Sequence, residues 1–261
     1  MKNKREVELV SVQQLGSDVF DMWIKDEEIA SSSKAGQFAS LYCNNESRLL
    51  PRPISICEIN KEDDLVRFVY RVVGKGTNEF SKLKASDKIS ILGPLGNGFT
   101  LEGKNILIVG GGIGIPPLLE LAKNLEGNKH IVLGFKDEIF LKEDFEKYGK
   151  VYISTEDGSH GTKGNVIDAV ISNNLLEDVS NGVKIDMIFT CGPLPMLRGL
   201  KEFAKKNNIT IQISLEERMA CGVGVCLSCV CKTKEKDPYT NVHNTRICME
   251  GPVFYGDEID I

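Results

Sequence analysis

Five of the eight cysteines in this chain lie near its C-terminus. Cys221, Cys226 and Cys229 follow the spacing C-x4-C-x2-C, and Cys248 comes after a further polar segment. Plant-type ferredoxins hold a 2Fe-2S cluster with this spacing. Small residues such as Gly222 let backbone N–H groups approach the sulfurs, and those hydrogen bonds help to set the reduction potential. The spacing therefore predicts a 2Fe-2S cluster on Cys221, Cys226, Cys229 and Cys248.

Two alternatives concern the same cysteines. Four cysteines can also form a structural zinc site, but zinc ribbons usually pair two C-x2-C knuckles and this segment has one. Cys231 competes for a ligand position. Residues separated by one in a strand point to opposite faces, so Cys231 should face away from the site that Cys229 faces. We therefore prefer Cys248 as the fourth ligand.

A glycine-rich turn precedes the middle of the chain. It runs from Gly110 to Gly114, follows the apolar segment Ile106–Val109 and comes just before an amphipathic stretch that begins at Pro117. Glycines in such a strand-to-helix turn let the backbone approach a pyrophosphate, although they also permit tight packing of a helix on a strand. We predict that Gly110, Gly112 and Gly114 contact a dinucleotide.

Two further candidates follow later strands of the same expected sheet. Cys191 stands in the segment Thr190-Cys-Gly-Pro193, where its thiol could lie beside a nicotinamide ring or simply fill space. Glu156 follows Thr155, and its carboxylate could accept hydrogen bonds from an adenosine ribose and repel a 2′-phosphate. This favours NAD over NADP, although acidic residues at loop tips are more often only solvated.

The N-terminal part holds two anion-binding elements. Arg52 begins a strand in the segment Arg52-Pro-Ile-Ser55, and Tyr70-Arg71 ends another strand before the pair Gly76-Thr77. An arginine at the start of a strand and a Gly-Thr turn that leads into a short helix could share one pyrophosphate.

The elements that would position these residues fall into three parts. Up to about Thr100, short β-branched or aromatic segments separated by Gly, Asn and Asp predict an antiparallel β-barrel. From Asn105, strands alternate with helical stretches, which predicts a doubly wound parallel α/β sheet. After Leu215 this periodicity stops, and the remaining segment is too short to build its own core unless something ties it together. The expected domains are residues 1–102, 103–214 and 215–261.

The expected elements are as follows. The barrel strands are Glu6–Val12, Val19–Ile24, Gln37–Tyr42, Ile54–Ile59, Leu65–Val73 and Lys88–Leu92, with one helix at Glu79–Leu83. The sheet strands are Ile106–Val109, Ile131–Phe135, Val151–Thr155, Asp186–Thr190 and Thr210–Ser214, and the helices among them are Pro117–Leu125, Asn165–Ser172 and Pro195–Lys206.

Composition excludes two classes of partner. A formal net charge of -5 without any basic run argues against a nucleic-acid surface. No stretch approaches the roughly 20 apolar residues that span a bilayer, and the N-terminal segment lacks the apolar part of a signal peptide. We expect a cytoplasmic protein that binds neither nucleic acid nor membrane.

The order of these motifs resembles the ferredoxin-NADP reductase superfamily over nearly the whole chain. The segments that carry the resemblance are Arg52-Pro-x-Ser55, Gly76-Thr77, Gly93-Pro-Leu-Gly-x-Gly-Phe99, Gly110-Gly-Gly-Ile-Gly114 and Cys191-Gly-Pro193. The resemblance implies FAD in the barrel, with the arginine at the pyrophosphate, the serine near the isoalloxazine and the Gly-Thr pair at a phosphate. The FAD-binding residues that it implies are Arg52, Pro53, Ile54, Ser55, Val69, Tyr70, Arg71, Gly76 and Thr77.

The C-terminal segment narrows the resemblance. The stretches from Leu215 to Thr233 and from Ile247 to Phe254 are similar to the electron-transfer subunits of bacterial type B dihydroorotate dehydrogenases. The resemblance implies that a separate FMN-containing subunit oxidises dihydroorotate in pyrimidine (UMP) biosynthesis, and that electrons pass through the 2Fe-2S cluster and FAD to NAD+. It also implies a heterotetramer with two copies of each subunit.

The predicted set of cofactors is chemically consistent. A hydride carries two electrons and an iron–sulfur cluster accepts one, so a flavin must stand between the nicotinamide and the cluster. We nominate no catalytic acid or base, and no dihydroorotate site is recognisable, so the chain should not be a complete dehydrogenase by itself.

Two other functions stay open. Small subunits of NADH-dependent ferredoxin oxidoreductase or sulfide dehydrogenase complexes share this architecture. A redox-sensing regulatory module that binds flavin and NAD without turnover belongs to a different class, but it explains little of the motif set.

Overall fold

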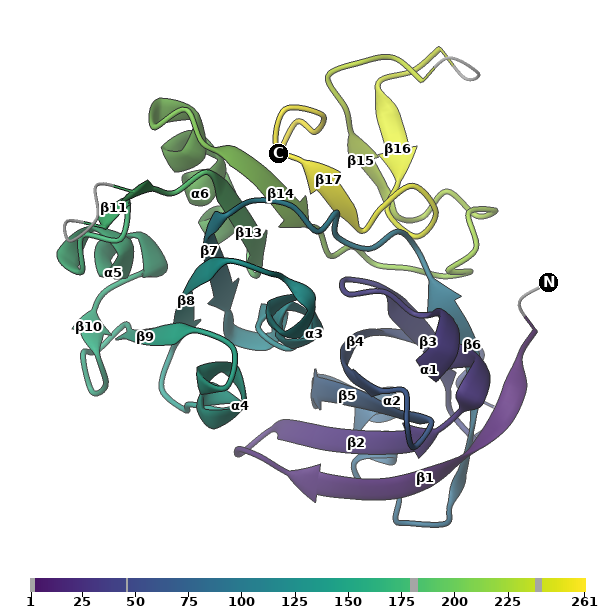
Figure 1. Cartoon of the computed structure of the whole chain (residues 1–261). Coiled ribbons are helices and arrows are strands. Elements are labelled where there is room, and N and C mark those ends of the chain that lie inside the picture. The colour runs from purple at the N-terminus through teal and green to yellow at the C-terminus, as the bar shows by residue number, and fades with distance from the viewer. Residues whose placement is uncertain (1–2, 46, 179–182, 238–240) are drawn as a thin grey trace.

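The structure is a computed structural model, and it describes residues 3–45, 47–178, 183–237 and 241–261. The chain begins with a closed barrel, in purple and blue in Figure 1, followed by a teal and green α/β sheet and a yellow C-terminal segment. This arrangement confirms the predicted combination of an antiparallel barrel with a parallel α/β sheet. Among the residues described, no helix is long and apolar enough to cross a membrane.

The barrel closes in the order β1-β2-β5-β4-β3-β6, and every neighbouring pair is antiparallel. Alternating side chains fill its interior, which includes Ile24, Leu41 and Phe68. Its elements are β1 (Arg5–Gln14), β2 (Val19–Lys25), α1 (Glu27–Ser32), β3 (Phe38–Tyr42), β4 (Arg52–Asn60), β5 (Leu65–Arg71), α2 (Lys75–Phe80) and β6 (Lys88–Leu95).

The helices of the barrel correct the sequence prediction. The expected helix at Glu79–Leu83 begins earlier, because α2 starts at Lys75. A glycine inside a helix costs about 1 kcal/mol, but here the Thr77 hydroxyl accepts hydrogen bonds from the N–H groups of Val73 and Gly74 and supports the first turn. Helix α1 was not predicted. It is six residues long and is capped by Asp26, which accepts a hydrogen bond from the N–H of Ile29.

The second sheet has the order β10-β9-β8-β7-β13-β14-β17 within the described ranges. All of its pairs are parallel except the last, in which β17 runs antiparallel to β14. Its strands are β7 (Asn105–Gly111), β8 (Asn128–Phe135), β9 (Lys150–Thr155), β10 (Thr162–Lys163), β13 (Met187–Cys191), β14 (Thr210–Ser214) and β17 (Val253–Tyr255). Two small strand pairs lie outside it, β11 (Glu177–Asp178) with β12 (Val183–Lys184) and β15 (Val230–Lys232) with β16 (Asn244–Arg246).

Helices cover both faces of this sheet, as expected for a doubly wound fold. Leu118 of α3 and Phe145 of α4 belong to the apolar cluster on one face, whereas Val166 of α5 and Leu200 of α6 belong to the cluster on the other. The helices are α3 (Pro117–Asn124), α4 (Lys142–Glu146), α5 (Val166–Ser172) and α6 (Leu194–Lys206), with the 3-10 turn η1 (Gly112–Gly114) before α3. Helix α4, which is five residues long, was not predicted.

The C-terminal segment is tied to the rest of the chain by a shared core. Ile247, Phe254 and Ile259 are buried in the cluster that contains Ile213 of β14 and Leu200 of α6. Strand β17 also extends the sheet (Figure 1). A segment of this length cannot bury enough apolar surface alone. It is stabilised instead by packing on the core of the α/β sheet.

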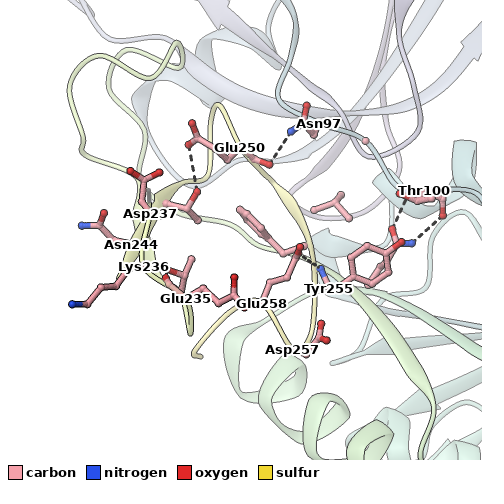
Figure 2. A pocket seen from close by; sticks show the side chains of 16 residues that line it. Asn97, Thr100, Glu235, Lys236, Asp237, Asn244, Glu250, Tyr255, Asp257 and Glu258 are labelled. Atoms are coloured by element: carbon pink, nitrogen blue, oxygen red, sulfur yellow. Dashed lines mark hydrogen bonds between the residues drawn. The ribbon is translucent and has the colours of Figure 1, made fainter. Parts of the chain in front are cut away.

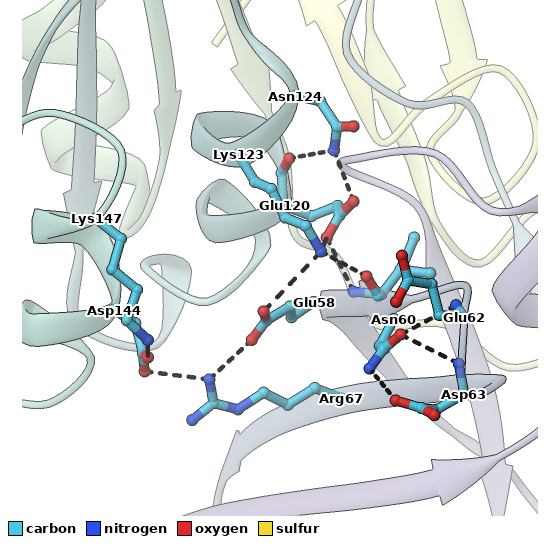
Figure 3. A network of polar contacts seen from close by, with 11 residues as sticks. Glu58, Asn60, Glu62, Asp63, Arg67, Glu120, Lys123, Asn124, Asp144 and Lys147 are labelled. Atoms are coloured by element: carbon cyan, nitrogen blue, oxygen red, sulfur yellow. Dashed lines mark hydrogen bonds and ion pairs between the residues drawn. The ribbon is translucent and has the colours of Figure 1, made fainter.

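A polar network joins the barrel to the α/β sheet (Figure 3). The buried Arg67 of β5 forms ion pairs with Glu58 of β4 and with Asp144 of α4, each at 3.1 Å. Beside it, Glu120 of α3 reaches the backbone of β4. The barrel and the sheet therefore meet over both apolar and charged contacts, which hold them in one arrangement.

Candidate functional site

The loop that begins at Cys221 is arranged around sulfur atoms. The Sγ atom of Cys221 accepts hydrogen bonds from the backbone N–H groups of Val223 at 3.5 Å, Val225 at 3.3 Å and Cys226 at 3.4 Å. The backbone can turn inward in this way because Gly222 has a φ of 69°, a left-handed conformation that favours glycine. The loop thus offers a cage of N–H donors for a negatively charged sulfur.

Two of the other three predicted ligands, Cys229 and Cys248, receive the same kind of support. Gly224 donates its backbone N–H to Sγ of Cys248 at 3.1 Å, and Cys248 donates its own N–H to Sγ of Cys229 at 3.4 Å. The side chain of Cys221 also interacts with that of Cys226, and the side chain of Cys248 with that of Cys229. The structure therefore brings the four predicted cysteines together as two pairs.

The electrostatics of the two pairs differ. Burial acts against ionisation of Cys221, but the hydrogen bonds from the surrounding N–H groups outweigh it and lower the pKa of this thiol to about 6. Burial raises the pKa of Cys248, and its hydrogen bond with Cys229 acts in the same direction. The surroundings of Cys221 thus favour its thiolate, whereas those of Cys248 favour its neutral thiol.

This donor set fits a two-iron cluster, which is held by four cysteine thiolates. Among the described residues, no three His, Cys, Asp or Glu side chains converge closely enough to hold one metal ion. Two pairs of thiols, each with N–H donors, match a cluster in which each iron takes two protein ligands. Cys231 lies in β15 opposite Thr245 of β16, and burial raises its pKa to about 11. The structure does not bring it into either pair.

The predicted pyrophosphate residues meet at one end of the barrel. A Cβ atom on Gly76 would overlap the Arg52 guanidinium, so this arginine lies directly against the first turn of α2. Arg52 also donates a hydrogen bond to the carbonyl of Leu50. A guanidinium that is held against a helix start beside Thr77 provides a fixed, positively charged cradle, which fits the pyrophosphate of a dinucleotide such as FAD.

The remaining predicted flavin residues are divided between two faces of the barrel wall. Ile54 and Tyr70 belong to the barrel interior, and the buried Tyr70 hydroxyl has no hydrogen-bond partner among the described residues. Val69 lies in the apolar cluster shared with the α/β sheet. Arg71 forms an ion pair with Asp18 at 3.1 Å.

Pro53 and Ser55 lie on the outer face of β4. This face is next to the loop Cys221–Cys229, which we call the cysteine loop. In the strand pairing, Pro53 lies opposite Ser40 of β3, and Ser55 lies opposite Phe38. A Cβ atom on Gly222 would lie 2.9 Å from Oγ of Ser40. The cysteine loop therefore rests on the strand beside the Arg52-Pro-Ile-Ser55 segment.

The glycine turn packs against the segment that contains Cys191. A Cβ atom on Gly114 would lie 2.5 Å from Cα of Gly192, and one on Gly110 would lie 2.9 Å from the Ile115 side chain. These two glycines are therefore required by packing within the chain. Gly112 differs, because its φ is 52° and a Cβ atom there would have no atom within 4 Å. Gly112 is the glycine of the predicted set that faces open space.

Cys191 and Glu156 lie at the same edge of the sheet as this turn. Cys191 ends β13 and pairs with Gly110 of β7, and burial raises the pKa of its thiol to about 12. It is therefore a neutral thiol at pH 7 rather than a nucleophile. Glu156 is exposed directly after β9, two strands from β7. Carboxyl ends of parallel strands at one edge form the usual ligand crevice of such sheets.

Comparison with known proteins identifies the family. Residues 216–260 match the family model described as the iron-sulfur cluster binding domain of dihydroorotate dehydrogenase B. The chain is 41% identical over 261 residues to the electron transfer subunit of dihydroorotate dehydrogenase B (NAD(+)) from Caldanaerobacter subterraneus, covering 99% of both chains. It is also 41% identical to the subunit of the same name from Fusobacterium nucleatum, covering 95% of both. The chain belongs to this family.

Solved structures agree with this assignment. The chain is similar to one described under flavin-based electron bifurcation by the NADH-dependent reduced ferredoxin-NADP oxidoreductase, with a TM-score of 0.85, 31% identity and coverage of 100% of this chain and 91% of that one. The ferredoxin reductase of carbazole 1,9a-dioxygenase has a TM-score of 0.64 at 17% identity, over 80% of this chain and 67% of that one, and shows the fold alone. The predicted family resemblance and fold class are confirmed.

Two residues of this electron transfer subunit escaped the sequence prediction. Ser40 of β3 is buried where β3 pairs with β4 and contacts Gly222, and its hydroxyl has no hydrogen-bond partner among the described residues. Glu79 of α2 accepts hydrogen bonds from the N–H groups of Asn44 at 2.6 Å and Asn45 at 3.3 Å, and it pairs with Arg48. Glu79 thereby fixes the loop that leads into Arg52. Neither residue stands in a motif, so no sequence signal marked them.

A cavity of about 720 Å³ is lined mainly by residues of the C-terminal segment (Figure 2). Its walls include Asn97, which donates a hydrogen bond to the Glu250 carbonyl at 2.9 Å, and the acidic side chains of Asp257 and Glu258. None of the predicted cofactor residues lines it.

Proposed function

We propose that this chain carries electrons from an FMN-containing dihydroorotate dehydrogenase catalytic subunit to NAD+, as one step of pyrimidine (UMP) biosynthesis. Two copies of each subunit form a heterotetramer in this proposal. It places the complex in the cytoplasm, a reducing compartment in which the cluster cysteines stay available as thiolates. The names of relatives that are 41% identical over nearly the full chain support it.

Three functional parts correspond to residues 1–102, 103–214 and 215–261. The first would hold FAD through Arg52, Pro53, Ile54, Ser55, Val69, Tyr70, Arg71, Gly76 and Thr77. The second would hold NAD through Gly110, Gly112, Gly114, Glu156 and Cys191, and the third a 2Fe-2S cluster through Cys221, Cys226, Cys229 and Cys248. A bound flavin supplies the conversion between one-electron and two-electron transfer.

The chain's own residues bind and orient rather than exchange protons. Arg52, fixed against Gly76, offers its guanidinium to a pyrophosphate. Gly112 leaves open space where a dinucleotide backbone can approach. The neutral thiol of Cys191 closes the end of β13 without competing as a nucleophile. The N–H groups that surround Cys221 stabilise negative charge on sulfur.

The observation that carries the proposal is the contact between the cysteine loop and the flavin strand. Gly222 packs on Ser40, and Ser40 pairs with Pro53 of the predicted flavin segment. A cluster on the cysteines would thus stand near a flavin on that segment, with Ser40 of β3 at the contact between the two.

Apolar side chains surround the exposed side of the cysteine loop. Val225 is 79% exposed and Leu227 is 61% exposed, and Val223 and Met249 are also exposed. Such a patch is typical of an interaction site. We propose that the catalytic subunit docks on this patch, which would bring its cofactor close to the cluster.

An anaerobic titration of the purified complex tests the function. Dihydroorotate is added first and NADH second, while the flavin and iron–sulfur absorbance bands are followed together. If dihydroorotate bleaches both sets of bands only when the catalytic subunit is present, the proposal stands. If dihydroorotate never reduces the chain, the proposed partner is wrong.

A second candidate function is that of the small subunit of an NADH-dependent ferredoxin oxidoreductase complex. The similarity to the structure of an NADH-dependent reduced ferredoxin-NADP oxidoreductase, at 31% identity and a TM-score of 0.85, favours it. The same titration separates the two, since reduction by NADH with no response to dihydroorotate would support this second candidate.

A further inference from the structure

The strand that carries the predicted flavin segment loses one neighbour halfway along its length. Strand β4 pairs with β3 from Arg52 to Ser55, and from Ile56 to Asn60 it pairs with β5. Beyond Ser55, no strand among the described residues pairs with the edge of β4 that faces away from β5. The N–H and C=O groups of Ile59 lie on this edge, and buried backbone groups of this kind need partners.

Two side chains of α3 supply those partners (Figure 3). Oε2 of Glu120 accepts a hydrogen bond from the N–H of Ile59 at 2.9 Å, and Nζ of Lys123 donates one to the carbonyl of Ile59 at 2.6 Å. One acceptor and one donor thus reproduce the pairing that a neighbouring strand would give. We call this contact of Glu120 and Lys123 with Ile59 the α3–β4 clasp.

The acidic half of the clasp is buried, its lysine is half-buried, and the two support each other. Glu120 is 4% exposed, and its carboxylate lies 3.6 Å from the Lys123 ammonium. Asn124 donates a further hydrogen bond from Nδ2 to Oε1 of Glu120 at 2.6 Å. Lys123 also lies 4.0 Å from Glu58. Each charge of the clasp therefore has an opposite charge or a hydrogen-bond partner, which fixes its geometry.

The position of the clasp connects the two predicted dinucleotide sites. Helix α3 begins at Pro117, three residues after Gly114 at the end of the glycine turn, and the clasp lies on its next turn. Strand β4 begins with the Arg52–Ser55 segment and ends with the clasp. A short helix and a short strand, both packed in the core, therefore join the glycine turn to the flavin segment.

We propose that Glu120 and Lys123 are positioning residues for hydride exchange between nicotinamide and flavin. In this step NADH loses a hydride and becomes NAD+, and the flavin gains that hydride; in the physiological direction the same transfer runs in reverse. The inference rests on the proposed function. Hydride transfer needs reacting atoms at about 3–3.5 Å, and a misplacement of about 1 Å can cost roughly 100-fold in rate. The clasp would hold the glycine turn Gly110–Gly114 at a fixed place relative to the Arg52–Ser55 segment.

The test is rapid-mixing reduction of FAD by NADH in the intact complex without oxygen. Glu120→Ala removes the acceptor for the Ile59 N–H, and Lys123→Met removes the donor to its carbonyl. We expect each to lower the limiting rate of flavin reduction about tenfold while the half-saturating NADH concentration, FAD content and cluster absorbance stay unchanged. Glu120→Gln should restore most of the rate, because its amide oxygen can still accept from Ile59.

A matched control and a second readout separate positioning from a general loss of structure. Lys129→Met removes a lysine that binds the carbonyls of Ala122 and Leu125 at the end of α3 without touching the barrel. It should keep the wild-type rate. Amide hydrogen exchange at Ile59 should accelerate in Glu120→Ala and Lys123→Met and stay slow in the control.

The outcomes distinguish the inference from the function. Limiting rates equal to wild type in both Glu120→Ala and Lys123→Met would overturn the inference, and so would an equal loss of rate in Lys129→Met. In either case, reduction of the wild-type flavin by NADH would leave the proposed function standing. If NADH fails to reduce the wild-type flavin, the proposed function is refuted first and the inference with it. Should Glu120→Ala not fold, Lys123→Met and Glu120→Gln decide the question.

Discussion

Replacing Gly76 with alanine tests the flavin end of the barrel without removing any polar group. The new methyl group would overlap Nε and Cζ of Arg52 and lie 2.7 Å from its Nη2. Arg52 would have to leave the first turn of α2 and with it a bound pyrophosphate. A hydrogen bond to a charged group contributes about 1.5–3 kcal/mol, and each ~1.4 kcal/mol is a tenfold change in dissociation constant. We therefore expect FAD affinity to fall about 10- to 150-fold for one lost bond.

The assay is titration of the apoprotein with FAD, followed by quenching of flavin fluorescence. Gly199→Ala is the matched control, because Gly199 lies inside α6, outside the predicted FAD-binding set, and a Cβ atom there would lie 3.3 Å from Cδ1 of Ile167. It should bind FAD as the wild type does. Alanine is favoured over glycine inside a helix by roughly 0.5–1 kcal/mol, so the Gly76→Ala apoprotein should not melt earlier than the wild type.

A double-mutant cycle supplies the result that would refute this reasoning. If Gly76→Ala acts only by displacing Arg52, it should change FAD affinity little in an Arg52→Ala background. An equal loss in both backgrounds would mean that the methyl group blocks the ligand itself. Unchanged affinity in Gly76→Ala alone would show that Arg52 does not bind the pyrophosphate from its position on α2.

Three further predictions concern the cluster and its surroundings. Cys248→Ser should abolish the iron–sulfur absorbance of the reconstituted chain, whereas Cys231→Ser should keep it, and the reverse result would reassign the fourth ligand. Glu79→Ala removes the acceptor that fixes the loop before Arg52, so FAD should dissociate at least several-fold faster, while a wild-type dissociation rate would remove Glu79 from the site. Val225→Asp should weaken assembly with the catalytic subunit about 10-fold or more, as measured by size-exclusion chromatography. The control Ile171→Asp, at a 58% exposed position on α5, should not weaken it. Equal assembly of both variants would mean that the catalytic subunit docks on another surface.

Local patterns predicted most of the fold because strands and long helices leave periodic signals. The strand Val19–Ile24 and the helix Pro195–Lys206 lie close to their observed bounds. Helices α1 and α4 escaped because six and five residues are too short for a helical period. The pairing of β17 with β14 also escaped, since contacts between distant segments follow from packing rather than from local propensity.

The residues of the candidate site were also predicted only in part. Cys221, Cys226, Cys229 and Cys248 were named by spacing, and the structure brings them together as two pairs. Ser40 was not named, because a serine in a strand carries no signal until the loop that covers it is known. Glu120 and Lys123 form part of an ordinary amphipathic helix in the sequence. Their contacts with Ile59 become visible only in the structure, where the β3–β4 pairing ends before Ile59 and leaves its N–H and C=O groups to α3.

The three parts of the chain pack on shared apolar clusters. This packing sets the distances between the predicted cofactor residues. Phe38 and Leu95 of the barrel lie in the same apolar cluster as Cys229, Cys248 and the α/β sheet. The cysteine loop is therefore held from both sides, by the barrel through Ser40 and by the sheet through this cluster. Packed interiors resist small displacements, so the distance between strand β4 and the cysteine loop is set by side-chain packing rather than by a linker. A carrier that must pass single electrons on one side and hydrides on the other gains from such a frame, because both distances stay constant while substrates come and go.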